Sequence, residues 1–173
     1  MHQPREPDRL CSQAEQSITS SLDAIADLLN WFEACWPAPA ADADAAQEAH
    51  EQTLKLQAQT ALVEAFSNAV RHAHADLDPA PDVILAWHSD RDRFSLQVID
   101  RGSRFAPEQC FATLREHLAS GAAHPSQRDR GWGLLMFVRL CDQHGWSIAS
   151  EQLSQGGNCL SLSHAWALPA GSA

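Results

Sequence analysis

The sequence predicts an α+β fold, a two-layer sandwich in which helices cover one face of a mostly antiparallel sheet. Apolar residues recur at helical spacing in two long segments between residues 20 and 74. Two shorter runs between residues 82 and 100 instead alternate apolar and polar side chains, as the strands of a hairpin do. Two further helices and two further strands follow, and this order is typical of helices layered on a sheet of hairpins.

The N-terminal part of the chain is predicted to hold an arm followed by two helices. Residues 1–16 are polar, contain two prolines and show no periodicity, so we expect a mobile N-terminal arm. Residues 20–36 have the helical pattern, with Ser20 and Asp23 placed to form a capping box and prolines ending the segment. After an alanine-rich linker, the helical pattern resumes over residues 47–74.

The remaining chain is predicted to consist of two hairpins separated by two helices. A polar loop lies between these helices, and a glycine opens the second one. The sequence shows no internal repeat, so residues 17–170 are predicted to form a single domain. The predicted elements are strands over 82–89 and 94–100, a helix over 106–120, a loop over 121–130, a helix over 131–145, and strands over 146–153 and 159–168.

Charge and composition disfavour several classes of function. The chain has 12 Lys and Arg against 22 Asp and Glu, a net charge of -10, which repels a phosphate backbone and disfavours direct nucleic-acid binding. Lys55 is the one lysine and no GxxxxGK[ST] motif is present, so a nucleotide site must be built in another way. Apolar runs fall short of the about 20 residues of a membrane span, and the N-terminus lacks a signal peptide's apolar core. We therefore expect no membrane contact.

Cysteine and histidine usage favours a reducing compartment over metal or disulfide chemistry. The five cysteines are odd in number and contain no CxxC pair, which suits buried thiols in the cytoplasm. The pair His72 and His74 has an i, i+2 spacing, which points the two rings apart on a helix and disfavours a metal site.

One face of the second helix carries polar side chains at helical spacing. Glu64, Asn68, Arg71 and His72 share this face, because residues three and four apart lie one above another on a helix. Apolar residues cover most of the remaining circumference. The polar stripe is therefore either a solvated surface whose groups pair with one another or a buried face that needs a partner.

Two glycine-containing segments follow. Asp100 ends an apolar strand, Gly102 comes two residues later and Phe105 closes the turn. A carboxylate in this position can accept a hydrogen bond from an exocyclic amine, and a glycine lets a planar ring lie against the backbone. An ordinary turn has the same D-x-G pattern, so this motif alone leaves both interpretations open.

The second segment is "RDRGWGLLMF". Gly131 and Gly133 open an apolar helix, whose unpaired N–H groups and positive dipole end can meet phosphate oxygens. Arg128 and Arg130 stand beside them and carry the matching charge. The alternative is a loop whose glycines only turn the chain.

Taken in order, the three motifs resemble the N, G1 and G2 boxes of the GHKL (Bergerat) ATP-binding fold. Within that superfamily the chain looks most like the bacterial anti-sigma factor serine/threonine-protein kinases, on the segments "ALVEAFSNAVRHAH", "VIDRGSRFAPEQC" and "RGWGLLMFVRLCD". The likeness spans about residues 20–168. Arg104 stands where the family often has a second glycine, and Asn158 follows Gly157 where the family often has threonine.

The resemblance implies ATP and Mg²⁺ as cofactors. It makes Glu64 the general base and Asn68 the ligand of Mg²⁺ through its side-chain oxygen. Arg71 and His72 either support the phosphates or pair with acids. The residues expected to bind ATP are Asn68, Arg71, His72, Asp100, Gly102, Phe105, Arg128, Arg130, Gly131, Trp132, Gly133 and Leu134.

The resemblance also implies a function and partners. It points to a cytoplasmic regulatory serine/threonine kinase that binds a sigma factor and phosphorylates a STAS-type anti-sigma factor antagonist, with a homodimer as one possibility. The acidic charge fits a regulator that acts on proteins and does not touch DNA. The alternatives are a non-catalytic ATP-gated protein-binding switch and, ranked lower, a detached histidine-kinase catalytic domain.

Overall fold

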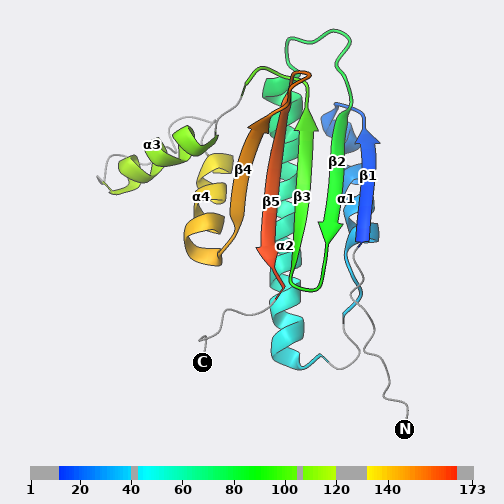
Figure 1. Cartoon of the computed structure of the whole chain (residues 1–173), viewed down its shortest axis with the longest axis vertical. Coiled ribbons are helices and arrows are strands. Elements are labelled where there is room, and N and C mark those ends of the chain that lie inside the picture. Colours follow the sequence, from blue (N-terminus) through cyan, green and yellow to red (C-terminus); the bar gives the residue numbers. More distant parts are fainter. Residues whose placement is uncertain (1–11, 40–42, 105–106, 120–131, 167–173) are drawn as a thin grey trace.

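A five-stranded antiparallel sheet with helices packed behind it makes up the described part of the chain (Figure 1). The computed structural model describes residues 12–39, 43–104, 107–119 and 132–166. The strand order is β1-β2-β3-β5-β4. The elements are β1 (Ser12–Ile18), the 3₁₀ turn η1 (Leu22–Ala24), α1 (Ile25–Cys35), α2 (Ala45–Asn68), the π-helical turn η2 (Ala69–Ala73), β2 (Val83–Ser89), β3 (Arg93–Asp100), α3 (Pro107–Ala119), α4 (Trp132–His144), β4 (Ser147–Gln152) and β5 (Asn158–Ala165).

The predicted α+β sandwich is confirmed, and the N-terminal arm needs a correction. Ser12–Ile18, most of which falls within the expected arm, forms β1 and pairs with β2 over seven residues. The sequence hides this strand because its side chains are mostly polar and exposed, as an edge strand on a one-sided sheet allows. Residues 1–11 of the expected arm and the expected loop over 121–130 lie outside the described residues.

Side-chain caps mark the starts of η1, which leads into α1, and of α2. Ser21, and not Ser20, is the N-cap of η1, since its hydroxyl accepts a hydrogen bond from the Asp23 amide at 3.2 Å. Asp44 caps α2 by accepting from the Gln47 amide at 2.8 Å. Such caps satisfy backbone donors that have no partner inside the helix. The capping-box prediction was therefore wrong by one residue, and Ser20 is free for another contact.

The hydrophobic core lies between the sheet and the helices α1 and α2. Trp87, Leu96 and Leu162 stand directly opposite one another on β2, β3 and β5, and all three have an exposed fraction of 0%. From the helix side, Phe32 of α1 meets Trp87 edge-on, with ring centroids 6.4 Å apart. Each such side chain contributes roughly 1.5–3 kcal/mol of burial free energy. Leu62 of α2 is also fully buried.

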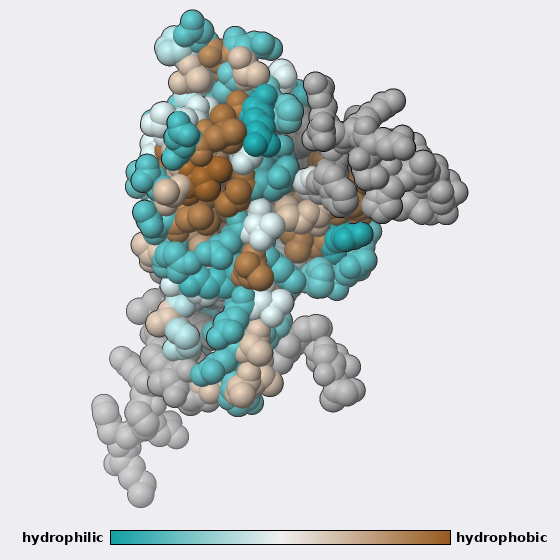
Figure 2. Space-filling view, turned by 180° about the vertical axis from the view of Figure 1, so that it is seen from behind, coloured by the Kyte–Doolittle hydropathy of each residue, from teal (hydrophilic) through white to brown (hydrophobic). Residues whose placement is uncertain are grey.

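The helix-covered side of the molecule carries an apolar patch surrounded by hydrophilic side chains (Figure 2). Among the residues only partly buried against the core are Ile25 and Leu29 of α1 and Val63 and Val70 of α2. Within the described residues, none of the helices combines the length and the apolar character needed to cross a membrane.

The order of the strands brings distant parts of the chain together. The chain leaves β3, passes through α3, α4 and β4, and returns as β5 between β3 and β4. As a result Asp100, the last residue of β3, is paired with Asn158, the first residue of β5. α2 lies behind the middle of the sheet and ends near the end of β3 (Figure 1). This is the region where the predicted motifs converge.

Candidate functional site

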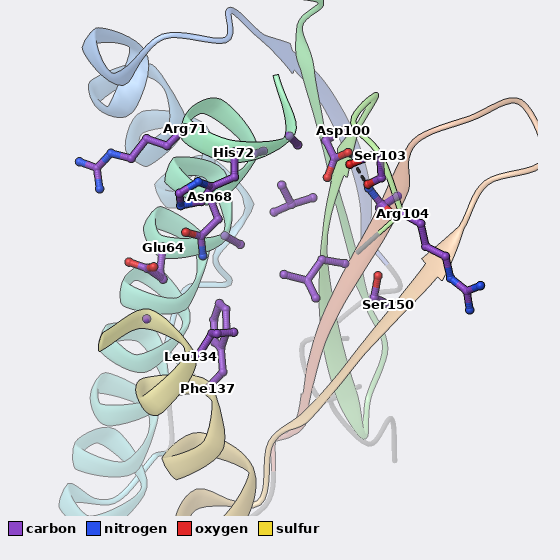
Figure 3. Close-up of a pocket in the computed structure, with 17 residues that line it drawn as sticks. Glu64, Asn68, Arg71, His72, Asp100, Ser103, Arg104, Leu134, Phe137 and Ser150 are labelled. Atoms are coloured by element: carbon purple, nitrogen blue, oxygen red, sulfur yellow. Dashed lines mark hydrogen bonds between the residues drawn. The ribbon is translucent and has the colours of Figure 1, made fainter. Parts of the chain in front are cut away.

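A cavity of about 440 Å³ lies between the C-terminal part of α2, the start of α4 and the sheet (Figure 3). Its wall includes residues from each of the three motif segments, which the order of the elements brings together. The lining residues are Glu64, Ala65, Asn68, Ala69, Arg71, His72, Ala73, Val98, Asp100, Ser103, Arg104, Gly133, Leu134, Phe137, Ser150, Asn158 and Leu160.

The helix wall of this cavity is the predicted polar stripe. Glu64 and Asn68 are half-buried, whereas Arg71 and His72 are exposed. Within the described residues, no hydrogen bond or ion pair joins the side chains of this stripe. The stripe is thus a cavity wall and not a self-paired surface. In Figure 3 the side chain of Arg71 extends away from the cavity.

The start of α4 contacts α2 at Glu64. A Cβ atom on Gly133 would lie 1.8 Å from Oε1 of Glu64, so only a glycine admits the carboxylate here. The close approach explains why a glycine stands in an apolar helix, where it otherwise lowers stability. Leu134 lines the cavity one residue later, and Trp132 begins α4.

Asp100 forms the opposite end of the cavity and is held by two donors. Its Oδ1 accepts from the backbone N–H of Gly102 at 2.8 Å and from Nδ2 of Asn158 at 2.9 Å. The same Asn158 amide donates to the Ser103 carbonyl at 2.8 Å, and the residue is only 2% exposed. Among the described residues both bonds go to Oδ1, which leaves Oδ2 as an acceptor for a ligand.

Several predicted site residues lie elsewhere than expected or cannot be placed. Gly102 does not line the cavity. It packs closely on Ala73 instead, and a Cβ at this position would lie 2.6 Å from the Ala73 backbone. Gly102 thus packs between the D-x-G turn and η2, and its contact with ATP stays a prediction. Phe105, Arg128, Arg130 and Gly131 lie outside the described residues.

Sequence reasoning missed much of the sheet wall. Val98, Leu160 and Ser150 stand side by side on β3, β5 and β4 and all line the cavity. The alternation of apolar residues that includes Val98 was a signal, but the positions of Leu160 and Ser150 depend on strand register, which the sequence does not give. Arg104 and Asn158, noted in the sequence as departures from a family pattern, both belong to the wall.

The cavity fits a nucleotide with a divalent cation. Its middle is apolar, and Asp100 lies across it from Asn68 and Glu64 (Figure 3). Within the described part of the chain, no group of three or more His, Cys, Asp or Glu side chains could hold a metal. A hard cation that keeps few protein ligands and completes its shell with phosphate oxygens, as Mg²⁺ does, matches the amide of Asn68 on the helix wall.

Comparison with known proteins supports this interpretation. The model of the histidine kinase-like ATPase domain matches residues 18–164, most of the chain. No curated protein matches the sequence. Domains of this family bind ATP, generally with Mg²⁺. Since the family match runs from the end of β1 to the end of β5 and includes every wall of the cavity, the chain belongs to the histidine kinase-like ATPase domain family.

Proposed function

We propose that this protein is an ATP-dependent regulatory serine/threonine kinase that uses the cavity between α2 and the sheet. One observation carries the proposal: Glu64 and Asn68 lie one turn apart on the cavity wall, facing the start of α4, with Asp100 on the opposite wall. The arrangement supplies a hydrogen-bond acceptor for the adenine at one end, and at the other end an amide for the cation that accompanies the phosphates and a carboxylate that can act as general base.

Each of these side chains takes one part in the reaction. Oδ2 of Asp100 accepts from the exocyclic amine of adenine, because Oδ1 is already occupied by two donors. The side-chain oxygen of Asn68 would hold a cation, which would neutralise charge on the phosphates. Backbone N–H groups at the start of α4 face the phosphates.

Glu64 is placed to act as the general base. Its carboxylate takes the proton from an attacking serine or threonine hydroxyl. The hydroxyl oxygen forms a bond to the γ-phosphorus while the bond from that phosphorus to the bridging oxygen breaks, so that ADP leaves. The contact with Gly133 keeps the carboxylate beside the start of α4, where the phosphates are expected.

The protein partners are proposed from the resemblance of the three motifs to anti-sigma factor kinases. The phosphate acceptor is a STAS-type anti-sigma factor antagonist, and the protein inhibits a sigma factor by binding it. The net charge of -10 supports a partner that is a protein and not a nucleic acid.

The decisive experiment combines nucleotide binding with phosphate transfer. Mg-ATP affinity is measured by calorimetry, and transfer of the γ-phosphate is followed with a STAS-type antagonist from the same genome. Glu64→Ala should retain ATP binding and lose transfer by at least about 10²-fold, the usual contribution of a general base. Asn68→Ala should lose Mg-dependent binding. Glu48→Ala, at an exposed glutamate of the same helix, serves as the matched control.

The same contacts support one alternative, an ATP-gated switch without phosphate transfer. Leu134 and Phe137 of α4 line the cavity, so a nucleotide bound there can shift α4 and change the affinity for a partner. In that case Glu64→Ala should regulate its partner normally, and wild-type protein should bind ATP without transferring phosphate to any antagonist. Wild-type transfer that Glu64→Ala abolishes decides for the kinase.

A further inference from the structure

His74 follows directly after η2 and is buried although it takes no part in the cavity wall. Its exposed fraction is 3%, and the lining residues do not include it. Its backbone N–H donates to the Ala69 carbonyl at 2.9 Å, five residues back, which closes the π-helical turn. Such π turns are frequent at functional sites. The turn brings the His74 ring to the sheet side of the helix end.

Both ring nitrogens of His74 have partners from distant segments. Nε2 lies 2.9 Å from the backbone nitrogen of Arg101, and Nδ1 lies 2.9 Å from the hydroxyl of Ser20. A backbone N–H can only donate, so Nε2 must be unprotonated. The proton of the neutral ring is therefore on Nδ1 and is donated to Ser20. This follows from the chemistry of the partners, which fixes the tautomer.

The Arg101 amide belongs to the turn that presents Asp100 to the cavity. It is the peptide nitrogen directly after Asp100 and directly before Gly102, whose own N–H binds the Asp100 carboxylate. The turn is thus held from two sides, by Asn158 from the sheet and by His74 from the helix end. Gly102 strengthens the second attachment, because its lack of a side chain lets it pack on Ala73.

We propose that His74 is a positioning residue which, as a neutral imidazole, holds the turn from Asp100 to Gly102 in the form that binds the adenine of the nucleotide. This rests on the adenine contact of Asp100 proposed above. A protonated ring would carry N–H groups on both nitrogens. Nε2 would then face the Arg101 N–H as a second donor, and the turn would lose its attachment to the helix.

The surroundings of the ring favour the neutral form. Burial lowers the pKa of His74 from 6.5, while the charge of Asp100 and the backbone carbonyl of Pro81 oppose this shift. The Arg101 guanidinium points to the Gly156 carbonyl, 3.3 Å away. Because the folded-state pKa lies below the unfolded value, the attachment is complete above about pH 6.5 and is lost as the pH falls through the folded value.

The first test uses the protein without nucleotide. Ring ¹⁵N shifts should show His74 in the neutral form with its proton on Nδ1. Hydrogen exchange at the Arg101 amide should be slow in the wild type and at least tenfold faster in His74→Leu. A ring protonated on Nε2 at neutral pH, or equal exchange in both proteins, would overturn the inference without touching the proposed kinase reaction.

The second test measures Mg-ATP affinity for wild type and variants across pH. At pH 7.5, His74→Leu should bind about tenfold more weakly, the factor expected for one lost hydrogen bond. The ratio of variant to wild-type Kd should approach one at the pH where the wild-type ring becomes protonated. Taking the ratio removes the titration of the nucleotide, which is the same in both measurements.

A conservative variant and a control variant complete the measurement of Mg-ATP affinity. His74→Gln offers Oε1 to the Arg101 amide, so it should recover part of the affinity and lose the pH dependence of binding. His88→Gln, at an exposed histidine of β2, should match the wild type at every pH. A constant ratio through the titration of the His74 ring would overturn the inference. Absence of ATP binding by the wild type would instead reject the proposed function.

Discussion

Alanine substitutions at two neighbouring glycines of the β4–β5 turn can distinguish the cost of backbone strain from the cost of steric overlap. Gly156 and Gly157 have φ values of +87° and +95°, which side chains rarely adopt. A Cβ on Gly156 would meet nothing within 4 Å, whereas a Cβ on Gly157 would lie 2.0 Å from the Asp100 carbonyl oxygen. Alanine at the two positions therefore shares the strain and differs in the overlap.

The difference in stability follows from these contacts. The left-handed backbone costs alanine about 1–2 kcal/mol at either position. At Gly157 the overlap adds about 1–3 kcal/mol, typical of overpacking, because the contacted atom is backbone and Asp100 is paired with Asn158 in the sheet. An excess of about 2 kcal/mol lowers Tm by roughly 6 °C in a domain of this size.

Thermal and urea unfolding, followed by circular dichroism, measure this difference directly. Gly157→Ala should unfold at a clearly lower temperature and urea concentration than Gly156→Ala, with the same dependence on urea. Gly157→Ala should also weaken Mg-ATP binding, since the displaced atoms adjoin the Asp100 carboxylate. Equal midpoints for the two variants would refute the close approach of this turn to β3.

Three further predictions address the core, the α2–α4 contact and a surface ion pair. Leu62→Ala, at a fully buried position of α2, should lower the free energy of unfolding by about 2–5 kcal/mol in urea titrations. Gly133→Ala should displace the Glu64 carboxylate and reduce phosphate transfer at least about tenfold, while thermal unfolding changes little because a flexible side-chain end absorbs the overlap. The Arg115 guanidinium, 2.6 Å from Asp142, lowers the pKa of that carboxyl below 3.8. Arg115→Gln should raise this pKa toward 3.8 in an NMR titration.

A control variant, a contradicting outcome or a direction of pH dependence tests each of these predictions. Leu56→Ala, at a 65% exposed position of the same helix, should change stability by less than about 0.5 kcal/mol. A large loss of stability in Gly133→Ala would show that helix backbone, and not the Glu64 side chain, meets the added methyl group. Because the pKa of Asp142 is lowered, its pairing with Arg115 stabilises the folded state above pH 3.8. This stabilisation is lost as the pH falls through the folded-state pKa of Asp142. Added salt should shrink the effect, since both groups are exposed.

The local parts of the structure could be read from the sequence. Helical spacing placed Glu64 and Asn68 on one face, because the geometry of a helix is set by the residues within it. Alternation placed Val98 and Leu96 on the buried side of β3 for the same reason. The α+β order followed from these local periods, and the motifs they carried led to the ATPase family.

Other features depended on contacts between distant segments. β1 is a strand because β2 offers backbone partners to a polar segment, and nothing in residues 12–16 alone indicates this. Ser150 reaches the cavity only through its register with Leu160. His74 and Gly133 take their roles from Arg101 and Glu64, each more than 25 residues away. Such contacts form only when the whole chain packs, because register and close approach are set by the combined burial of many side chains and not by any local preference.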